Sequence, residues 1–227
     1  MTVFYPDVSN VNWGNTELTR DCQQKLMDFL YQLRSQGLSA VAHKVTQGAD
    51  FVDPYAWLCQ TWCQQVRFPF IGYHYIDTSD PAAQAANWKA AGGGANAMLD
   101  WENGGGNLDN FWNVVNAFNA VGVNIALAYM PHWYWEEQGG GDLAPIPQNG
   151  ISLVSSAYPM GDSAGPPADL YRGCDGDTGE GWTPYGGATP TIWQYTDAAR
   201  ISGIFVDCNA FRGTSAQLVQ LFTGATA

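Results

Sequence analysis

Strand-like and helix-like segments alternate from the N-terminus to Met130, and this alternation limits the folds that the chain can adopt. Apolar residues recur at helical spacing between Leu18 and Leu33, whereas Leu38–Val45 is a short apolar run of strand length. We predict strands at Thr2–Tyr5, Leu38–Val45, Phe70–Ile76, Ala95–Asp100 and Val123–Met130, and helices at Leu18–Leu33, Asp53–Val66, Asp80–Ala91 and Leu108–Gly122. Alternating units of this kind form parallel strands joined by right-handed crossovers.

After Met130 the alternation breaks. Residues 131–190 are rich in Gly, Pro and aromatic residues and contain one predicted strand, Ile151–Tyr158. Two more predicted strands, Thr191–Thr196 and Gly203–Asn209, have no long helix between them, and Ser215–Phe222 is a predicted final helix. A length of 227 residues suits one domain. We therefore predict an α/β fold over residues 1–227, an irregular and incomplete β/α barrel with about five βα units followed by further strands.

The charge balance excludes two classes of partner. Nine Lys and Arg against 21 Asp and Glu give a formal net charge of −12. So few basic residues cannot build a nucleic-acid footprint or a polybasic membrane patch. No apolar run has the length of a membrane span, and the first residues, MTVFYPDVSN, lack the basic and apolar regions of a secretory signal. We expect no nucleic-acid partner, no membrane partner and synthesis in the cytoplasm.

The sequence contains no complete cofactor or metal motif. The five cysteines are odd in number and irregularly spaced, and we expect Cys59 and Cys63 to be buried, reduced thiols. Asp175 and Asp177 resemble part of a calcium loop, but the Glu needed further along is missing. Gly104–Gly106 lies between a strand and a helix without the pattern of a phosphate loop. We expect no cofactor and no bound metal.

Acidic residues follow several of the predicted strands. In β/α barrels the working residues lie at the C-terminal ends of the strands, so these acids are expected on one rim. They are Asp7, Asp77, Asp100, Glu102 and Asp207. Helix N-caps are the alternative role for acids after strands, and they account for Asp53 and Asp80. They do not account for Asp100 and Glu102, because the segment NGGGN separates this pair from the next helix.

Asp100 and Glu102 are spaced for a shared task. Residues i and i+2 of a strand point to the same side, so the two carboxyl groups share a face and Trp101 points away. Two carboxylates this close cannot both ionise freely, and the raised pKa of one makes it an acid near neutral pH. Glycosidases need this combination. Alternatively, the pair could hold a divalent metal, with Asp7 and Asp207 as further oxygen ligands.

Several segments, in chain order, resemble glycoside hydrolase family 25, the Chalaropsis-type lysozymes of bacteria, fungi and phage endolysins. The resemblance extends over nearly the whole chain, and the motifs are specific in combination although each is weak alone. The segments are YPDVSN (Tyr5–Asn10), VAHKVTQG (Val41–Gly48), GYHYIDTSDPAAQAANW (Gly72–Trp88), MLDWEN (Met98–Asn103), IALAYMPHWYW (Ile125–Trp135), TIWQYTD (Thr191–Asp197) and FVDCNAF (Phe205–Phe211).

The resemblance implies a lysozyme, a 1,4-β-N-acetylmuramidase that cuts peptidoglycan glycan strands between N-acetylmuramic acid and N-acetylglucosamine. It implies Glu102 as the general acid, and Asp100 as the group that orients the substrate N-acetyl group or serves as the second carboxylate. Asp7 and Asp207 would line the same cleft and tune the charge of that pair. Tyr73, Tyr129 and Trp193 would contact sugars, with core packing as the alternative for each.

A phage endolysin is the specific role that this resemblance favours. Such a protein is made in the host cytoplasm without a signal peptide, reaches the wall when a holin opens the membrane, and is expected here to be a monomer. Gln47 departs from the family, which typically has Glu in this segment, and the long 131–190 segment departs as well. Two alternatives stay open: a non-enzymatic carbohydrate-binding or virion structural module on a degenerate barrel, and a metal-dependent hydrolase.

Overall fold

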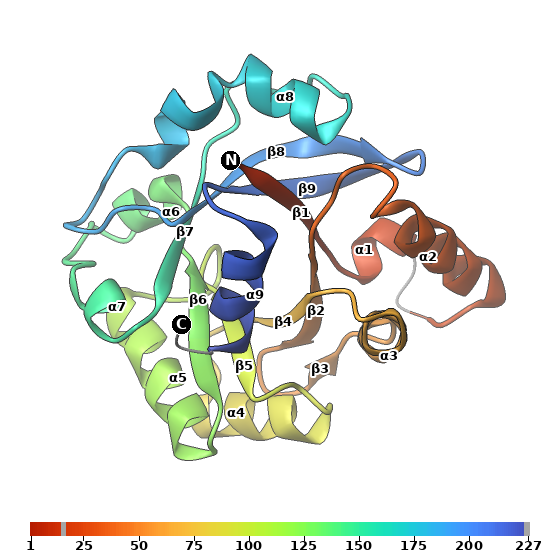
Figure 1. The fold of residues 1–227 in the computed structure, drawn as a ribbon. Helices are drawn as coiled ribbons and strands as arrows, with labels where there is room; N and C mark the ends of the chain where they lie inside the picture. Colours follow the sequence, from red (N-terminus) through yellow and green to blue (C-terminus); the bar gives the residue numbers. More distant parts are fainter. Residues whose placement is uncertain (15–16, 225–227) are drawn as a thin grey trace.

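The computed structural model describes residues 1–14 and 17–224 and shows a ring of strands with helices around its outside (Figure 1). The strands are β1 (Val3–Val8), β2 (Val41–Gln47), β3 (Phe51–Val52), β4 (Phe70–Tyr75), β5 (Asn96–Asp100), β6 (Asn124–Tyr129), β7 (Ser152–Ser156), β8 (Ile192–Ile201) and β9 (Ile204–Phe211). They form a nine-stranded sheet in the order β1-β9-β8-β7-β6-β5-β4-β2-β3, and pairing of β1 with β2 closes it into a barrel. The predicted irregular β/α barrel is confirmed.

The sheet departs from a regular parallel barrel at β3, which pairs antiparallel with β2, and at the last two strands. The pairs β1–β2, β2–β4, β4–β5, β5–β6, β6–β7 and β7–β8 are parallel, whereas β9 runs antiparallel to both β8 and β1. Ser202 and Gly203 connect β8 to β9, and both have positive φ, at 52° and 78°. Such two-residue turns match the twist of paired strands, so β9 folds back directly and fills the place of the last parallel strand.

The helices alternate with the strands as predicted up to β6. They are α1 (Asn10–Trp13), α2 (Arg20–Gln32), α3 (Ala56–Val66), α4 (Pro81–Ala90), α5 (Leu108–Ala120), α6 (His132–Glu137), α7 (Pro145–Gln148), α8 (Pro167–Gly173) and α9 (Ser215–Thr223), with 3-10 turns η1 (Gly176–Thr178) and η2 (Glu180–Trp182). None of the described helices has both the length and the apolar content needed to cross a membrane.

Two of the predicted boundaries are corrected. The first strand does not end at Tyr5 but continues through Pro6 and Asp7 to Val8, because β9 pairs with it along this length and the fixed φ of proline suits an extended chain. The helix predicted from Asp53 begins at Ala56. Asp53 is therefore not its N-cap; its carboxylate accepts hydrogen bonds from the backbone N–H groups of Asn10 and Tyr55. Asp80 does cap α4, with Pro81 in the first turn as predicted.

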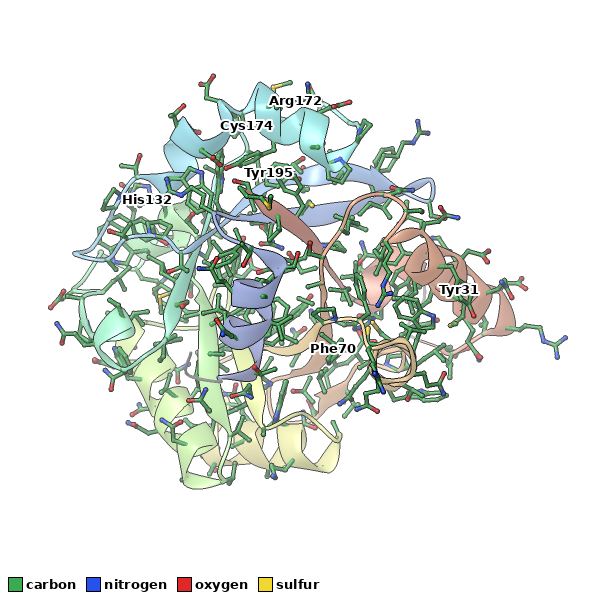
Figure 2. All side chains as sticks on the ribbon, in the orientation of Figure 1. Tyr31, Phe70, His132, Arg172, Cys174 and Tyr195 are labelled. Atoms are coloured by element: carbon green, nitrogen blue, oxygen red, sulfur yellow. The ribbon has the colours of Figure 1, made fainter. Side chains whose placement is uncertain are left out.

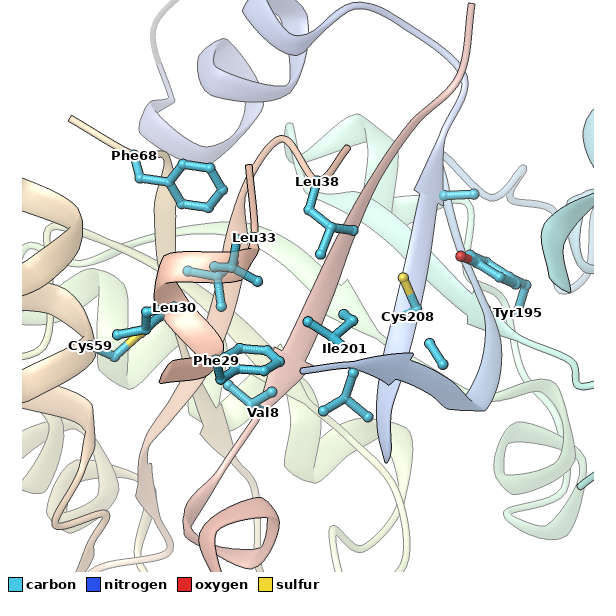
Figure 3. Packing of buried hydrophobic residues seen from close by; sticks show 14 of the residues in the cluster. Val8, Phe29, Leu30, Leu33, Leu38, Cys59, Phe68, Tyr195, Ile201 and Cys208 are labelled. Carbon is cyan, nitrogen blue, oxygen red and sulfur yellow. The ribbon is translucent and has the colours of Figure 1, made fainter. Parts of the chain in front are cut away.

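Apolar side chains pack both outside and inside the barrel. Figure 3 shows one outer cluster, in which Phe29 and Leu30 of α2, and Leu33 directly after it, lie close to Val8 of β1. Inside the barrel, Leu218 and Phe222 of α9 are buried, and the ring of Phe222 lies edge-on 5.2 Å from that of Tyr5. In Figure 1, α9 lies across one end of the barrel.

The position of α9 decides which end of the barrel can hold a site. Gln217, Leu221 and Gly224 lie beside Asn124 and Ala126, at the start of β6. The helix thus covers the end where the parallel strands begin. The opposite end, where they finish, stays open, and it is the end at which β/α barrels place their active sites.

Candidate active site

Four predicted acids meet in one cavity of about 140 Å³ at the open end of the barrel. Asp7 comes from β1, Asp100 from the last position of β5, Glu102 from the loop after it, and Asp207 from β9. Tyr73 of β4 and Tyr129 of β6, two of the predicted sugar contacts, line the same cavity.

Strand register explains the meeting of these side chains. Tyr75, Asp100 and Tyr129 are register partners across β4, β5 and β6. Asp7 is the register partner of Asp207 across β1 and β9. Tyr75, Asp100 and Tyr129 reach one space because parallel strands finish at the same level, and Asp207 joins them because the antiparallel β9 pairs it with Asp7.

Asp100 and Glu102 form a hydrogen-bonded carboxyl pair. Burial raises the pKa of both groups, and the charge of Glu102 raises that of Asp100 further. Their hydrogen bond raises the pKa of Asp100 and lowers that of Glu102, and the pair favours one shared proton over two ionised carboxylates. Trp101 points the other way, as predicted: it is fully buried against Tyr134, and its indole N–H donates to the carbonyl oxygen of Gly106 at 3.0 Å.

Asp7 and Asp207 form a second carboxyl pair. Burial raises the pKa of each, and Asp207 hydrogen-bonds to Asp7. Oδ2 of Asp7 also accepts from Gln194 Nε2 at 2.9 Å and from Asn209 Nδ2 at 2.6 Å. These donors favour the ionised form of Asp7, and the charge of Asp7 in turn raises the pKa of Asp207.

Lys44 is the one basic side chain among the described residues that line the cavity. Its ammonium group lies 4.8 Å from the ring centroid of Tyr75 and 5.8 Å from that of Tyr73. Its Nζ donates to Oε1 of Gln47 at 3.2 Å. The positive charge lowers the pKa of both Asp100 and Glu102, against the effect of burial. Because Gln47 is neutral, it holds Lys44 without cancelling this charge.

Sequence reasoning missed several cavity residues. Besides Lys44 they are Tyr75, Tyr158, Gln194 and Asn209. Gln194 Oε1 accepts from the hydroxyl groups of Tyr129, at 3.0 Å, and Tyr158. A signal for Asn209 was present, because it lies two positions after Asp207 on one strand and therefore on the same face.

Trp193 does not lie with the other predicted sugar contacts. It alternates with the inward-facing Gln194 on β8 and so points outward, where it is fully buried beside Tyr171 and Trp182. Its indole N–H donates to the carbonyl oxygen of Ala157 at 2.9 Å. Trp193 is a core residue here. Figure 2 places its strand neighbour Tyr195 below α8, close to Cys174.

His74 also lies outside the cavity. Its imidazole is buried between Thr46 and Gln84, with Nδ1 2.7 Å from Thr46 Oγ1 and Nε2 2.8 Å from Gln84 Oε1. Burial lowers the pKa of His74 to about 4, so the ring is neutral at physiological pH. Among residues 1–14 and 17–224, no group of three or more His, Cys, Asp and Glu has the arrangement of a metal site.

No protein-family model and no curated protein sequence matches the chain. Solved structures do. The chain is similar to a bacterial lysozyme from Streptomyces coelicolor, with 20% identity, a TM-score of 0.70 and coverage of 99% of this chain and 98% of that one. It is similar to a family GH25 lysozyme from Aspergillus fumigatus, with 20% identity, a TM-score of 0.68 and coverage of 98% and 99%.

A third similar structure is the catalytic domain of an endolysin from bacteriophage P40 of Listeria monocytogenes. It has 16% identity, a TM-score of 0.63 and coverage of 97% of this chain and 98% of that domain. In all three comparisons the match extends over nearly the whole length of both chains. At these identities the similarity establishes the fold, and this protein has the irregular β/α barrel of those lysozymes and endolysins.

Proposed function

We propose that this protein is a glycoside hydrolase of family 25, a lysozyme that cleaves peptidoglycan between N-acetylmuramic acid and N-acetylglucosamine. In this proposal the chain is one catalytic domain that works as a monomer. A phage endolysin is the role that fits it, made in the host cytoplasm and released to the wall through a holin. The endolysin domain among the similar structures supports this role.

The observation that carries the proposal is the state of the Asp100 carboxyl group. One of its oxygens, Oδ1, is buried at the cavity and has no hydrogen-bond partner among the described residues. A buried polar atom without a partner is costly, so a ligand that supplies a donor gains affinity. The acetamido N–H of an N-acetylated sugar is such a donor, and Asp100 is the residue expected to orient this group.

The same contact would favour the protonated form of Glu102, which the general acid needs. A hydrogen bond from the acetamido N–H stabilises ionised Asp100, and the proton that the pair shares then moves to Glu102. Glu102 gives this proton to the glycosidic oxygen as the bond from the sugar C1 to that oxygen breaks. The ionised Asp100 faces the positive charge that develops on the sugar, and water completes the hydrolysis.

The test is the release of new reducing ends from purified peptidoglycan, together with clearing of a wall suspension. Glu102→Gln should lower the rate by about 10²–10⁴-fold, because a carboxamide cannot donate the proton. Glu137→Gln is the matched control, since Glu137 is an exposed residue at the end of α6. Products that end in N-acetylmuramic acid would identify the bond that is cut.

Two results would contradict the proposal. If Glu102→Gln and wild type release reducing ends equally fast, Glu102 is not the acid. If wild type binds several wall types but releases no reducing ends from any, the chain is instead a carbohydrate-binding module on a barrel of this fold.

A further inference from the structure

A cavity of about 390 Å³ opens on the outer wall of the barrel, away from the acids. It lies between α5 and α7, beside the start of β6 (Figure 1). Asn124, the first residue of β6, lines this outer cavity, whereas Tyr129, the last residue of β6, lines the acid cavity. An extended strand separates these residues by about 17 Å. The two cavities are therefore distinct.

The outer cavity exists because the helix layer is incomplete there. A regular β/α barrel places one long helix between successive strands. Between β6 and β7 this chain has α6, with six residues, and α7, with four. The short α7 leaves one side of α5 uncovered. Val115 of α5, together with Ile125 and Ile151, provides an apolar surface at the bottom of this gap.

The rim of the outer cavity is lined by polar side chains that carry no charge. Its polar side chains are four carboxamides, Asn116, Asn119, Asn124 and Asn149, and no ionisable residue is among its described lining residues. A half-buried tryptophan, Trp112, lies one helical turn before Asn116 on the same side of α5. This neutrality is notable in a chain whose net charge is −12.

The carboxamides have free hydrogen-bonding capacity. Asn116 and Asn119 are exposed, and no hydrogen bond of their side chains occurs in the described part of the chain. Asn124 uses Nδ2 to reach Oδ1 of Asn96 at 3.0 Å, which leaves its own oxygen open. Asn149 uses Nδ2 to reach the carbonyl oxygen of Pro145 at 2.8 Å, which also leaves its oxygen open. The cavity thus offers both donors and acceptors.

We propose that the outer cavity is a second, non-catalytic binding site for the uncharged N-acetylated hexosamine rings of a glycan chain. Sugar hydroxyl and acetamido groups need donors and acceptors together, which carboxamides supply. The indole of Trp112 offers an apolar face for a sugar ring, and the aliphatic floor suits an acetamido methyl group. A phosphate or carboxylate ligand would find no cation there. The inference rests on the proposed function for the polymer, which would be held here while another stretch of glycan is cut.

The first test measures binding in the Glu102→Gln background, where no turnover disturbs the equilibrium. The probes are a tetramer of N-acetylglucosamine and purified insoluble peptidoglycan. Asn116→Ala/Asn119→Ala should weaken binding to the outer cavity on the order of tenfold, the effect of losing a few net hydrogen bonds. Asn113→Ala is the matched control, because Asn113 is exposed on α5 but does not line the cavity.

The site of binding is read from the indole N–H resonance of Trp112, assigned with Trp112→Phe. The tetramer should shift this resonance in the Glu102→Gln protein and not in the protein that also carries Asn116→Ala/Asn119→Ala. Equal affinity of the two proteins, or shifts confined to residues of the acid cavity, would overturn the inference. If the tetramer binds but the wall does not, the site takes short N-acetylated oligomers and the proposed holding of peptidoglycan is wrong.

The second test separates this inference from the proposed function. With Glu102 intact, Asn116→Ala/Asn119→Ala should clear walls more slowly yet cut short soluble glycan fragments at the wild-type rate. Equal clearing of walls by variant and wild type contradicts the second site alone. Failure of the wild-type protein to release reducing ends from any substrate contradicts the proposed function, whatever the variant does.

Discussion

Asp7 and Asp207 lie directly opposite one another on the antiparallel strands β1 and β9. Two like charges at such a position would destabilise the sheet. Burial and then the charge of Asp7 raise the pKa of Asp207 well above its usual range, and Asp207 hydrogen-bonds to Asp7, so a shared proton relieves the repulsion. Asp100 and Glu102, two residues apart at the end of β5, form a second pair of carboxyl groups with raised pKa values in the same cavity.

Asp207→Asn should stabilise the fold at neutral pH by about 1–3 kcal/mol. The pKa of Asp207 is higher in the folded than in the unfolded chain, so the folded chain binds more protons between those two values. The stability from this group is full below the unfolded pKa of about 4 and is lost as the pH rises through the folded pKa. An amide donates to Asp7 as the protonated acid does, but it cannot ionise.

The measurement is urea unfolding at about pH 5 and about pH 8. Wild type should lose stability between the two, and Asp207→Asn should lose less. Asp162→Asn, at an exposed aspartate, is the control and should follow wild type. A variant that loses as much stability as wild type would show that Asp207 is not the proton-binding group.

Lys44→Met should move the pH–rate profile to higher pH. The ammonium group favours the ionised forms of Asp100 and Glu102, so without it the pKa of both carboxyl groups rises. Both limbs of a bell-shaped profile for kcat/KM should shift upward as a result. Lys89→Met, at an exposed lysine at the end of α4, should leave the profile in place.

The variant Gln47→Glu tests the effect of the Lys44 charge in an independent way. A carboxylate at this position would pair with Lys44, whose Nζ already donates to Gln47 at 3.2 Å. Pairing would weaken the effect of Lys44 on the acids, so the profile should move in the same direction as for Lys44→Met. A shift to lower pH would contradict the role that we assign to Lys44.

Trp193→Phe and Tyr129→Phe should separate packing from substrate contact. Trp193→Phe should lower the free energy of unfolding by about 1–3 kcal/mol through lost packing and a lost hydrogen bond, with KM unchanged. Tyr129→Phe should raise KM by roughly tenfold if its hydroxyl contacts the sugar. The stability of Tyr129→Phe should change little, since Gln194 Oε1 still accepts from Tyr158. A raised KM for Trp193→Phe would indicate instead that Trp193 contacts the substrate.

EDTA should leave the rate unchanged. Metal ligands must be deprotonated, whereas burial raises the pKa of Asp100 and Asp207, and Oδ2 of Asp7 already accepts from two amides. The assay compares dialysis against EDTA with dialysis against buffer, followed by addition of Mg²⁺, Ca²⁺ or Zn²⁺. Loss of activity with EDTA and its recovery with one of these ions would support the metal-dependent hydrolase instead.

Local patterns in the sequence were sufficient for the order of the first strands and helices and for the barrel. They also placed Asp100 and Glu102 on one face, because the two-residue period of a strand is a local property. Local patterns did not predict the end of β1 or the start of α3 correctly. Pairing with β9 extends β1 through Pro6, and hydrogen bonds made by Asp53 hold the loop before α3. Both depend on segments distant in the sequence.

The composition of the acid cavity was decided by the tertiary structure. Pairing of β1 with β9 brings Asp7 opposite Asp207, and strand register brings Lys44 and Gln194 to the same rim. The direction of Trp193, outward into the core, follows from the strand face that Gln194 occupies. The spacing of residues along one strand indicates which side chains share a face of the sheet. It does not indicate which face points into the barrel. The closed sheet decides which face of each strand points into the barrel. Because α9 covers one end of the barrel, the acids lie at the other end, which is open.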